Sequence, residues 1–342
     1  MTIHGNISLQ TLNTFGIDVS ARWYGRFADA GELEELSGMK PGARMLVLGG
    51  GSNILFTGNF DGLVLKNDVK GITQLHEDEE FVYVRAGAGE NWHRFVMYCI
   101  ERNWAGLENL ALIPGNVGAS PIQNIGAYGV EIDDVFWDLE AWDLADKKLV
   151  TFTRGDCEFG YRESVFKKRY PNRFVILNVT YQLRKHPRFH TGYGAIEDEL
   201  QRMGVQELSI KAIAEAVIRI RSAKLPDPAQ IGNAGSFFKN PLVTAEKFQQ
   251  LRREFAGIVG YENNEGMVKL AAGWLIEHCG PSDAVSWKGY RKGDAGCHEK
   301  QALVLVNHGK ASGAAIFELS SSILKSVEDK FGVVLEREVN II

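Results

Sequence analysis

Residues 114–129 read PGNVGASPIQNIGAYG, and this stretch decides the fold because few backbones other than a shaped loop accommodate it. It contains four glycines, two prolines and two asparagines. Glycine adopts positive φ and lets a backbone approach a ligand closely, whereas proline fixes φ and removes a donor. Residues 109–130 lack Lys, Arg, Asp, Glu and His, but their prolines and polar amides exclude a membrane helix. The stretch therefore predicts a buried loop around a polar ligand.

A phosphate group fits such a loop, because backbone N–H groups in successive turns form concave anion sites. A glycine-rich crossover loop without a ligand is the alternative. A second glycine turn, GGGSN at residues 49–53, lies between two apolar runs and offers similar donors. A Rossmann motif is not expected there, because Ile54, Leu55 and Phe56 favour a strand over a helix. A plain hairpin remains open for this turn.

Composition limits the classes of function. The chain has 342 residues, 45% hydrophobic and 24% charged, which is typical of a globular protein of two or three domains. Its net charge is −5 and it has no basic stripe with interleaved aromatics, so we expect no nucleic-acid partner. We expect a cytoplasmic location without a membrane partner, since a secretion signal and a long apolar run are absent from the sequence. The four cysteines lack zinc-ligand spacing, so we expect buried thiols and no metal.

Hydrophobic periodicity predicts mixed α and β structure. We expect strands at residues 45–48, 54–56, 63–65, 81–86, 174–183, 302–306 and 333–342, and an antiparallel sheet in residues 131–153. Apolar residues at helical spacing predict helices at residues 92–102, 208–221, 269–279 and 313–331. Two prolines in KLPDP, residues 224–228, end a helix and mark a domain boundary.

Three short segments carry candidate chemistry. Arg162 in FGYRES can clamp a carboxylate or phosphate through its planar fork, or it can form a surface salt bridge. Ser236 in GNAGSFFKNP can donate a proton to a carbanion, or it is a structural serine in a glycine turn. Glu336 and Glu338 point to one face of the last strand by alternation, and Arg337 points to the other. The alternative is that Glu336 and Glu338 are simply two exposed acids on a terminal strand.

Taken together, nine ordered segments resemble a known family. They are NTFGI (13–17), LGGGSN (48–53), AGAGENWH (86–93), GLENLALIPGNVGASPIQNIGAYGVEI (106–132), FGYRES (159–164), KLPDP (224–228), GNAGSFFKNP (232–241), KLAAGWLIE (269–277) and HEKQALVLVN (298–307). From about residue 13 to residue 339 the chain resembles the UDP-N-acetylenolpyruvoylglucosamine reductase (MurB) family. The TGYG stretch at residues 191–194 is similar to the family form that has a mobile tyrosine loop.

The resemblance implies an α+β architecture with an FAD-binding fold of the vanillyl-alcohol-oxidase (PCMH) type and a C-terminal α+β substrate domain. We expect one FAD-binding subdomain at residues 1–67, joined by the C-terminal strand 332–342, and a second at residues 68–223. The UDP-sugar domain is expected at residues 224–331. The KLPDP boundary inferred above agrees with this division.

The resemblance also implies a reaction. NADPH reduces FAD, and a hydride from flavin N5 then converts UDP-N-acetylglucosamine enolpyruvate to UDP-N-acetylmuramate in peptidoglycan precursor synthesis. Ser236 would protonate the carbanionic carbon, while Arg162 and Glu338 would stabilise the enolate-like carboxylate. A small-molecule UDP-sugar is therefore the expected partner, and the sequence does not indicate the oligomeric state.

The family's binding residues map onto positions of this chain. The implied cofactor-binding residues are Gly50, Gly51, Ser52, Asn53, Pro114, Gly115, Gly118, Ala119, Ser120, Asn124, Gly126, Tyr128 and Tyr161. The implied substrate-binding residues are Tyr193, Lys224, Asn240 and Gln301. One departure concerns the C-terminal segment, where Arg337 replaces a proline that is common in the family. The register there favours Glu338 over Glu336.

Overall fold

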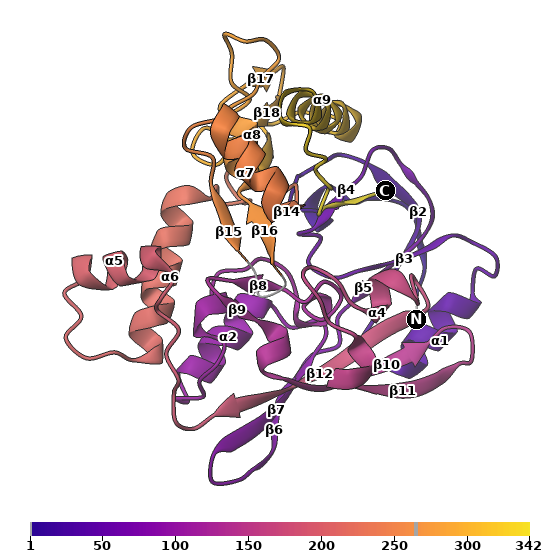
Figure 1. Ribbon diagram of the computed structural model, residues 1–342. Helices are drawn as coiled ribbons and strands as arrows, with labels where there is room; N and C mark the ends of the chain where they lie inside the picture. Colours follow the sequence, from indigo (N-terminus) through magenta and orange to yellow (C-terminus); the bar gives the residue numbers. More distant parts are fainter. Residues whose placement is uncertain (1, 263–265) are drawn as a thin grey trace. The chain divides into compact units, whose positions relative to one another are not determined.

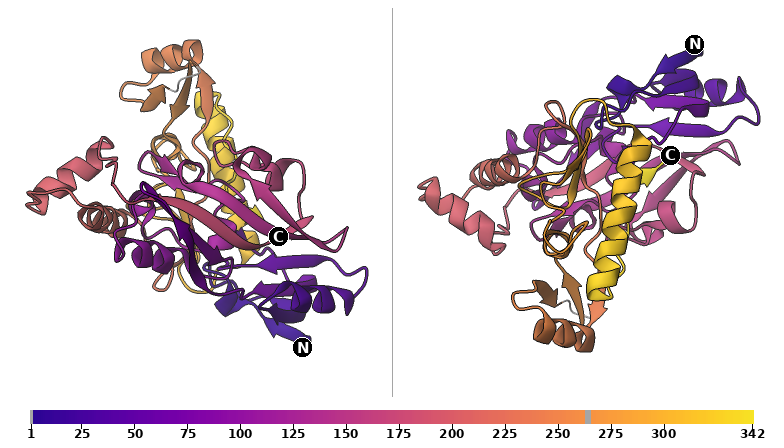
Figure 2. Two further views of the ribbon diagram at one scale, coloured as in Figure 1. Left: turned by 90° about the horizontal axis from the view of Figure 1, so that it is seen from below. Right: turned by 90° about the horizontal axis from the view of Figure 1, so that it is seen from above.

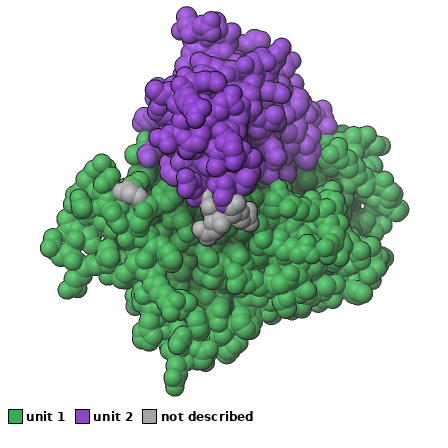
Figure 3. All heavy atoms as spheres, viewed as in Figure 1, with its two compact units in different colours: residues 1–7, 21–51, 60–223 green, residues 8–20, 52–59, 224–342 purple. Residues whose placement is uncertain are grey.

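The computed structural model describes residues 2–262 and 266–342, and the chain forms two compact units, which Figure 3 colours separately. Unit 1 comprises Met1–Ile7, Ala21–Gly51 and Phe60–Ala223. Unit 2 comprises Ser8–Ser20, Ser52–Asn59 and Lys224–Ile342. The chain therefore passes from one unit to the other within the glycine turn at residues 49–53 and again at Lys224. The three-domain division expected from the resemblance stays a prediction.

Unit 1 contains two larger sheets and several helices, labelled in Figure 1. Its strands are β1 (His4–Ser8), β2 (Ser20–Phe27), β3 (Met45–Leu48), β5 (Phe60–Asn67), β6 (Ile72–Glu77), β7 (Phe81–Gly87), β8 (Gly126–Ala127), β9 (Val130–Glu131), β10 (Phe136–Asp143), β11 (Lys148–Thr153) and β12 (Phe174–Arg184). Its helices are α1 (Ala30–Gly38), α2 (Trp92–Ile100), α3 (Arg154–Cys157), α4 (Val165–Lys168), α5 (Gly194–Arg202) and α6 (Ile210–Lys224). One sheet has the order β1-β2-β5-β3, and the other has the order β11-β10-β12-β7-β6.

The five-stranded sheet carries the main core of unit 1. Its strands are antiparallel, and most residues of β12 are buried, as expected for an inner strand covered on both faces. Tyr181 of β12 packs against Trp92 and Phe95 of α2, with ring centroids 5.9 and 5.0 Å away. The side chain of Asn91 caps α2 by accepting the N–H of Arg94. The predicted sheet in residues 131–153 and the predicted strand at residues 174–183 are confirmed.

Unit 2 contains two small antiparallel sheets, a parallel strand pair and a long helix. Its strands are β4 (Ile54–Leu55), β13 (Gly232–Ser236), β14 (Leu242–Thr244), β15 (Gly260–Glu262), β16 (Met267–Leu270), β17 (Arg291–Lys292), β18 (Ala295–Cys297), β19 (Val304–Asn307) and β20 (Asn340–Ile341). Its helices are α7 (Ala245–Glu254), α8 (Ala272–Glu277) and α9 (Gly313–Phe331), the last being the long yellow helix in Figure 2. The antiparallel sheets have the orders β13-β19-β18-β17 and β14-β16-β15, and β20 pairs with β4.

Short 3-10 helices complete the chain. They are η1 (Gln10–Leu12), η2 (Glu108–Leu110), η3 (Val117–Ala119) and η4 (Ile132–Asp134). The helix predicted at residues 313–331 is confirmed with both bounds, because Ser312 caps its start and Gly332, with φ of 59°, ends it. Its apolar stripe, which includes Ile316, Ile323 and Val327, is buried.

Two predicted elements need correction. Lys269 was expected to begin a helix, but it lies in β16, and α8 begins only at Ala272. Strands β14 and β15 both pair with β16, so these tertiary hydrogen bonds outweigh the helical pattern of KLAAGWLIE. The predicted strand at residues 333–342 is regular only in β20, and Arg337 forms an isolated bridge with Phe238.

Candidate active site

The glycine turn at residues 49–53 and the loop at residues 114–129 approach each other backbone to backbone within unit 1. A Cβ on Gly50 would lie 2.9 Å from Asn116 Oδ1 and 2.9 Å from the Cα of Gly115. A Cβ on Gly118 would lie 2.5 Å from the Cβ of Ala88. Both distances are shorter than real Cβ atoms tolerate. The two loops therefore need glycine at these positions, whatever ligand they hold.

This region also carries a cation and free donors. The amine of Lys66 donates to the carbonyl of Gly49 over 2.8 Å, and burial lowers the pKa of this amine, opposed by the charge of Asp68. Among the described residues, the backbone N–H groups of Gly50 and Ser52 have no hydrogen-bond acceptor. Amide donors beside a half-buried ammonium group suit an acidic ligand such as a diphosphate.

Arg162 lies in a strained turn against the same loop. Gly160 and Glu163 exchange backbone hydrogen bonds of 3.1 Å, and Arg162 between them has φ of 55°. This position of a turn usually requires glycine, so the side chain is held there at a cost of about 1–3 kcal/mol. The guanidinium donates to the carbonyl of Gly126 at 2.6 Å and to that of Asn124 at 3.4 Å. The predicted anion clamp is thus attached to the predicted cofactor loop.

Asn124 and Glu131 complete this contact. Asn124, with φ of 41°, donates to the Glu131 carboxylate over 2.7 Å, and that carboxylate lies 4.0 Å from Arg162. A Cβ on Gly126 would meet the Glu131 side chain at 2.7 Å and Arg162 at 3.2 Å. The structure therefore brings three predicted site residues, Asn124, Gly126 and Arg162, into one contact.

Tyr128 contacts the predicted substrate residue Tyr193. Their rings meet edge to face with centroids 5.9 Å apart, and Tyr193 is half exposed. Tyr128 has φ of 51°, and its hydroxyl lies close enough to Arg221 for the two groups to interact electrostatically. Burial raises the pKa of the Tyr128 hydroxyl, and the positive charge of Arg221 opposes this rise. Burial lowers the pKa of Arg221, while Tyr128 opposes that fall.

Sequence reasoning missed Arg221 and Asn109. Arg221 is an ordinary residue of an amphipathic helix until the fold places it beside Tyr128 and within 3.3 Å of the Leu112 carbonyl. Asn109 is 1% exposed, and its amide donates to the carbonyls of Tyr128 at 3.1 Å and His190 at 2.9 Å. It therefore links the cofactor loop to the chain that leads into TGYG. The only signal for Asn109 in the sequence was its place at the start of an uncharged run.

His93 has a structural partner. Its Nδ1 accepts the backbone N–H of Leu112 over 3.0 Å, and Leu112 has φ of 59°. Burial lowers the pKa of His93, with a smaller contribution from Arg221. His93 thus supports the turn that precedes the loop at residues 114–129.

The remaining predicted cofactor residues in unit 1 differ in how deeply they are buried. Ser120 is 1% exposed, and its hydroxyl is 2.8 Å from the Tyr181 hydroxyl and 2.8 Å from the Val117 carbonyl, so it faces the core. Gly51 is buried with φ of 64°, and the ring of Tyr161 lies 5.3 Å from the guanidinium of Arg162. Pro114 and Ala119 are exposed at the loop surface.

In unit 2, Ser236 ends strand β13, where sequence reasoning left a glycine turn open. Asn233 of β13 pairs with Val306, and Ser236 pairs with Val304 after a register shift. Ser236 is half-buried, and its hydroxyl has no hydrogen-bond partner among residues 2–262 and 266–342. The next two side chains, Phe237 and Phe238, are fully buried. The half-buried serine therefore directly precedes two buried rings in the chain, and its predicted role stays a prediction.

The NTFGI segment supports this strand from the start of the chain. The Thr14 hydroxyl donates to the Asn233 carbonyl at 2.6 Å, and the Asn233 N–H donates to the Thr14 carbonyl at 3.0 Å. A Cβ on Gly232 would collide with the Phe15 carbonyl oxygen. The Asn307 amide donates to that same oxygen at 2.9 Å. The segment thus holds β13 beside β19.

Glu338 lies across the ladder from Phe237, the residue that follows Ser236. Its N–H donates to the Phe237 carbonyl over 2.8 Å, and the side-chain amide of Asn53 donates to its carbonyl over 3.3 Å. The carbonyl of Asn53 accepts the N–H of Asn340 at 3.1 Å. The predicted cofactor residue Asn53 and the predicted catalytic residue Glu338 are therefore hydrogen-bonded to each other, and Glu338 is bonded to the residue after Ser236.

The rival acid Glu336 is engaged elsewhere. Its side chain is 71% exposed, and its carboxylate lies 3.1 Å from the amine of Lys239. The Lys239 N–H also donates to the Glu336 carbonyl at 2.9 Å. Glu336 is thus an exposed acid paired with Lys239, and the choice of Glu338 over Glu336 stays a prediction from the sequence.

Two predicted substrate residues meet at the start of α8. Asn240 Oδ1 accepts the N–H of Ala272 at 2.9 Å, and a Cβ on Gly273 would lie 3.0 Å from Gln301 Oε1. Lys224 is the last residue of α6, just before the two prolines. No contact in the structure joins Lys224 to Asn240 or Gln301 within the described ranges.

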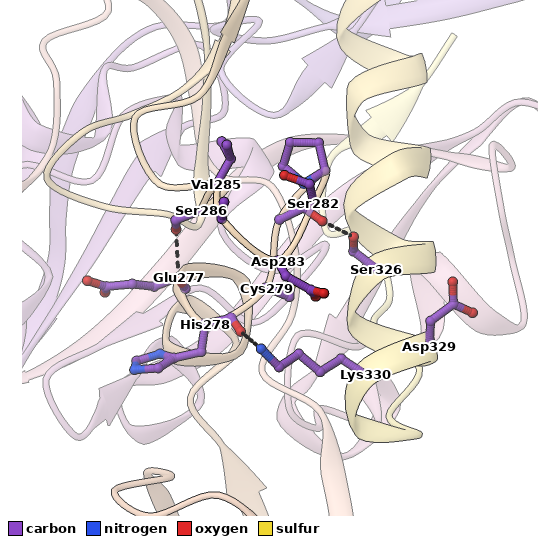
Figure 4. A pocket seen from close by; sticks show the side chains of 13 residues that line it. Glu277, His278, Cys279, Ser282, Asp283, Val285, Ser286, Ser326, Asp329 and Lys330 are labelled. Atoms are coloured by element: carbon purple, nitrogen blue, oxygen red, sulfur yellow. Dashed lines mark hydrogen bonds between the residues drawn. The ribbon is translucent and has the colours of Figure 1, made fainter.

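A hollow of about 710 Å³ lies on unit 2, outside these clusters (Figure 4). It is lined by the end of α8, the loop at residues 278–286 and the last turns of α9, and none of the predicted site residues line it. Ser326 donates to the Gly280 carbonyl at 2.8 Å and Lys330 to the His278 carbonyl at 2.6 Å. Its polar side chains therefore brace the loop.

The described residues contain neither a membrane-spanning helix nor a metal-binding cluster. No helix in residues 2–262 and 266–342 is long and apolar enough to cross a membrane. The same residues contain no cluster of three or more His, Cys, Asp or Glu side chains arranged to hold a metal ion. The four cysteines are buried free thiols, as predicted.

Comparison with known protein families identifies two domains in the chain. Residues 227–342 match the C-terminal domain of UDP-N-acetylenolpyruvoylglucosamine reductase, and residues 39–153 match an FAD-binding domain. The predicted α+β fold class and FAD as the cofactor are therefore confirmed.

Curated relatives extend the match over the whole chain. The chain is 48% identical to a UDP-N-acetylenolpyruvoylglucosamine reductase from Amoebophilus asiaticus, covering 100% of each sequence. It is 48% identical to the reductase from Pseudomonas putida, covering 98% of this chain and 97% of the relative. A crystal structure of MurB from Thermus caldophilus shares the fold, with a TM-score of 0.67, 23% identity and coverage of 100% and 99%. The chain belongs to the UDP-N-acetylenolpyruvoylglucosamine reductase family, whose members named above share its full length.

Proposed function

We propose that the protein reduces UDP-N-acetylglucosamine enolpyruvate to UDP-N-acetylmuramate, with NADPH as the reductant, in peptidoglycan precursor synthesis. The observation that carries the proposal is the pair of hydrogen bonds that Glu338 makes with Phe237, the residue after Ser236, and with Asn53 of the glycine turn, which supports a site shared by these segments. The full-length relationship to curated reductases gives the substrate class. A cytoplasmic location stays a prediction.

The loops of unit 1 fit an FAD diphosphate. Gly50 and Gly118 leave no room for a Cβ, so the backbones there come close enough for their amides to line a common surface. Lys66 and Arg221 supply positive charge near these loops. When bound, FAD supplies the hydride that it accepts from the nicotinamide. Gly50, Gly115 and Gly118 are the residues proposed to hold its phosphates.

Ser236 is the proposed proton donor. Its hydroxyl is half-buried and lacks a protein partner among the described residues, so it is available to a substrate carbon. A hydroxyl is a weak acid, but a carbanion conjugated with a carboxylate is a strong base that can take its proton. The backbone on either side of Ser236 is fixed by β19 and by the C-terminal segment, which holds the hydroxyl in place.

Arg162 and Glu338 are proposed to stabilise the charge that develops on the substrate carboxylate. Preorganised charge is usually the largest catalytic contribution. Arg162 already donates to the Gly126 carbonyl in a strained turn, so its position is set before substrate arrives. For the UDP part we propose Tyr193, Lys224, Asn240 and Gln301 as the binding residues. An exposed tyrosine ring suits stacking on uracil, and a lysine suits the diphosphate.

Separate measurement of the two half-reactions tests this function. Stopped-flow absorbance follows bleaching of the flavin by NADPH, and its return when UDP-N-acetylglucosamine enolpyruvate is added without oxygen. The Ser236→Ala variant is expected to bleach at the wild-type rate, because the serine takes no part in that step. The return of colour is expected to slow about 10²–10⁴-fold, which is the usual contribution of a positioned proton donor.

A matched control is Ser322→Ala, which removes a hydroxyl from the exposed side of α9, where it donates to the Glu318 carbonyl. Both half-reactions should survive this change. If Ser236→Ala returns to the oxidised state at the wild-type rate, the serine is not the proton donor. If the purified wild-type protein neither carries nor takes up FAD, the proposed function is wrong as a whole.

A further inference from the structure

The side chain of Arg337 attaches the C-terminal segment to helix α9. Its Nε donates to the Ser320 hydroxyl at 2.8 Å, and its Nη2 donates to the Ser321 hydroxyl at 2.7 Å. The guanidinium carbon lies 4.5 Å from the ring centroid of Phe317, in cation–π contact. Ser320 is itself fully buried and donates to the Phe317 carbonyl at 2.6 Å, so its position on α9 is fixed.

Arg337 acts as a tether, meaning that its side chain links the C-terminal segment to α9, and it is not part of an ion pair among the described residues. Within the part of the chain that the structure describes, it has no carboxylate at ion-pair distance. Its two sequence neighbours are glutamates, but strand alternation directs their side chains to the opposite face. Glu336 accordingly lies against Lys239. Arg337 instead directs its guanidinium group to two hydroxyls and an aromatic ring. A planar guanidinium group suits this geometry better than an ammonium group does.

The segment needs such a tether because its backbone pairing is short. Between residues 336 and 338 two backbone–backbone hydrogen bonds are described, from the Lys239 N–H to Glu336 and from the Glu338 N–H to Phe237, on either side of a single bridge between Phe238 and Arg337. Regular strand pairing resumes only at β20. A slip of one residue in a strand moves every side chain to the other face, and a single bridge opposes such a slip weakly.

We propose that Arg337 is a positioning residue that fixes the register of this segment, so that Glu338, and not a neighbour, is presented on the face of the ladder that serves catalysis. The inference rests on the proposed role of Glu338 in the second half-reaction. It gives a function to the position where the chain carries arginine in place of the family's common proline. The side-chain contacts with α9 restrict the backbone at this position, as the fixed φ of a proline would.

Variants at both ends of the tether test the inference. Arg337→Ala removes both hydrogen bonds and the cation–π contact, so we expect the return of flavin colour with substrate to slow at least 10-fold. A misplacement of about 1 Å can cost about 10²-fold in rate. FAD content and bleaching by NADPH should stay within about twofold of wild type. In steady state the loss should fall on kcat more than on KM, since Arg337 touches no proposed substrate-binding residue.

Two further variants separate register from general stability. Arg337→Lys keeps one donor and the charge, and should recover part of the lost rate. Ser320→Ala removes the acceptor on α9 without altering the C-terminal segment, and should reproduce a fraction of the loss. In the Arg337→Ala/Ser320→Ala double variant the two effects should be less than additive, because both act through one contact. Glu336→Gln, which changes an exposed acid paired with Lys239 and makes no contact with the tether among the described residues, is the control expected to leave both half-reactions unchanged.

The outcomes distinguish this inference from the proposed function. If Glu338→Gln restores flavin colour at the wild-type rate, the proposed role of Glu338 fails and the inference fails with it. If Glu338→Gln is slow but Arg337→Ala is as fast as wild type, the inference alone is overturned. It is also overturned if Arg337→Ala slows both half-reactions equally and Arg337→Lys recovers neither, because the arginine would then support only the fold.

Discussion

Gly50 offers the sharpest test of how the two glycine loops build the proposed cofactor site. The change is Gly50→Ala, which adds a single methyl group. The φ of Gly50 lies outside the left-handed region, so alanine can adopt this backbone without strain. Any effect of the substitution must therefore come from lack of space.

The magnitude follows from the contacts that the methyl group would make. It would lie 2.9 Å from both Asn116 Oδ1 and the Cα of Gly115, whereas ordinary contacts begin at 3.4 Å. The Asn116 side chain can rotate, but Gly115 can move only with its loop, by at least 0.5 Å (3.4 − 2.9). Overpacking of this kind costs about 1–3 kcal/mol. Moving one amide out of reach of a phosphate costs about 1.5–3 kcal/mol, which is about a 10- to 150-fold rise in Kd.

The assay is titration of the apoprotein with FAD, followed by the quenching of flavin fluorescence, together with thermal unfolding of the apoprotein. We expect the Kd of Gly50→Ala to rise at least 10-fold, with a smaller change in the stability of the apoprotein because the loop can yield. The control is Gly38→Ala at the end of α1, where a Cβ meets nothing within 4 Å. Gly38→Ala should leave FAD affinity unchanged.

The refuting result is simple. If Gly50→Ala binds FAD as tightly as wild type while Gly38→Ala also does, the close approach of the two loops has no part in cofactor binding. An apoprotein that unfolds far more easily, with unchanged affinity, would point the same way. The close packing at Gly50 would then serve the fold alone.

Two other predictions concern stability and reactivity. Arg173 donates to Asp143 and holds the pKa of this buried carboxyl at about 2, so the pair stabilises the fold fully above about pH 4 and loses this effect as the pH falls towards 2. Asp143→Asn should therefore lower the free energy of unfolding in urea at pH 7 and flatten its decline below pH 4; an unchanged pH profile would contradict this. Burial raises the pKa of all four cysteine thiols. Iodoacetamide at pH 8 should therefore label the cysteines of the native protein slowly and those of the urea-unfolded protein quickly. Rapid labelling of the native protein would contradict their burial.

Periodicity predicted those elements whose neighbours only reinforce a local pattern. The helix at α9 has a continuous apolar stripe between a serine cap and a glycine stop, and both bounds were predicted. Strand β12 has an apolar run that suits an inner strand. Prediction failed where a partner strand decides the outcome, as at Lys269, because β14 and β15 lie elsewhere in the sequence.

In the site, too, the features set by local sequence were predicted and those set by distant contacts were not. Glycine and proline identified the loop at residues 114–129, because their backbone preferences are local properties. The contact of Arg221 with Tyr128 could not be predicted, since it depends on the path of α6. The strained turn at Arg162 could not be predicted either, because no local rule places an arginine at positive φ. Such strain persists only where the surrounding structure imposes it.

The backbone around Ser236 shows why the sequence motifs of this family carry more information than the proposed catalytic residues alone. Thr14 and Asn233 are 219 residues apart, yet they exchange hydrogen bonds, and the N–H of Glu338 from the end of the chain reaches the next carbonyl after Ser236. Each contact closes a long loop, whose entropic cost must be met by an accurate fit. Gly232 must stay small because the Phe15 carbonyl occupies the space of a Cβ. The serine and the glutamate are single side chains, whereas their geometry depends on NTFGI, GNAGSFF and the last ten residues together, so substitutions in those segments should impair catalysis without touching a reacting group.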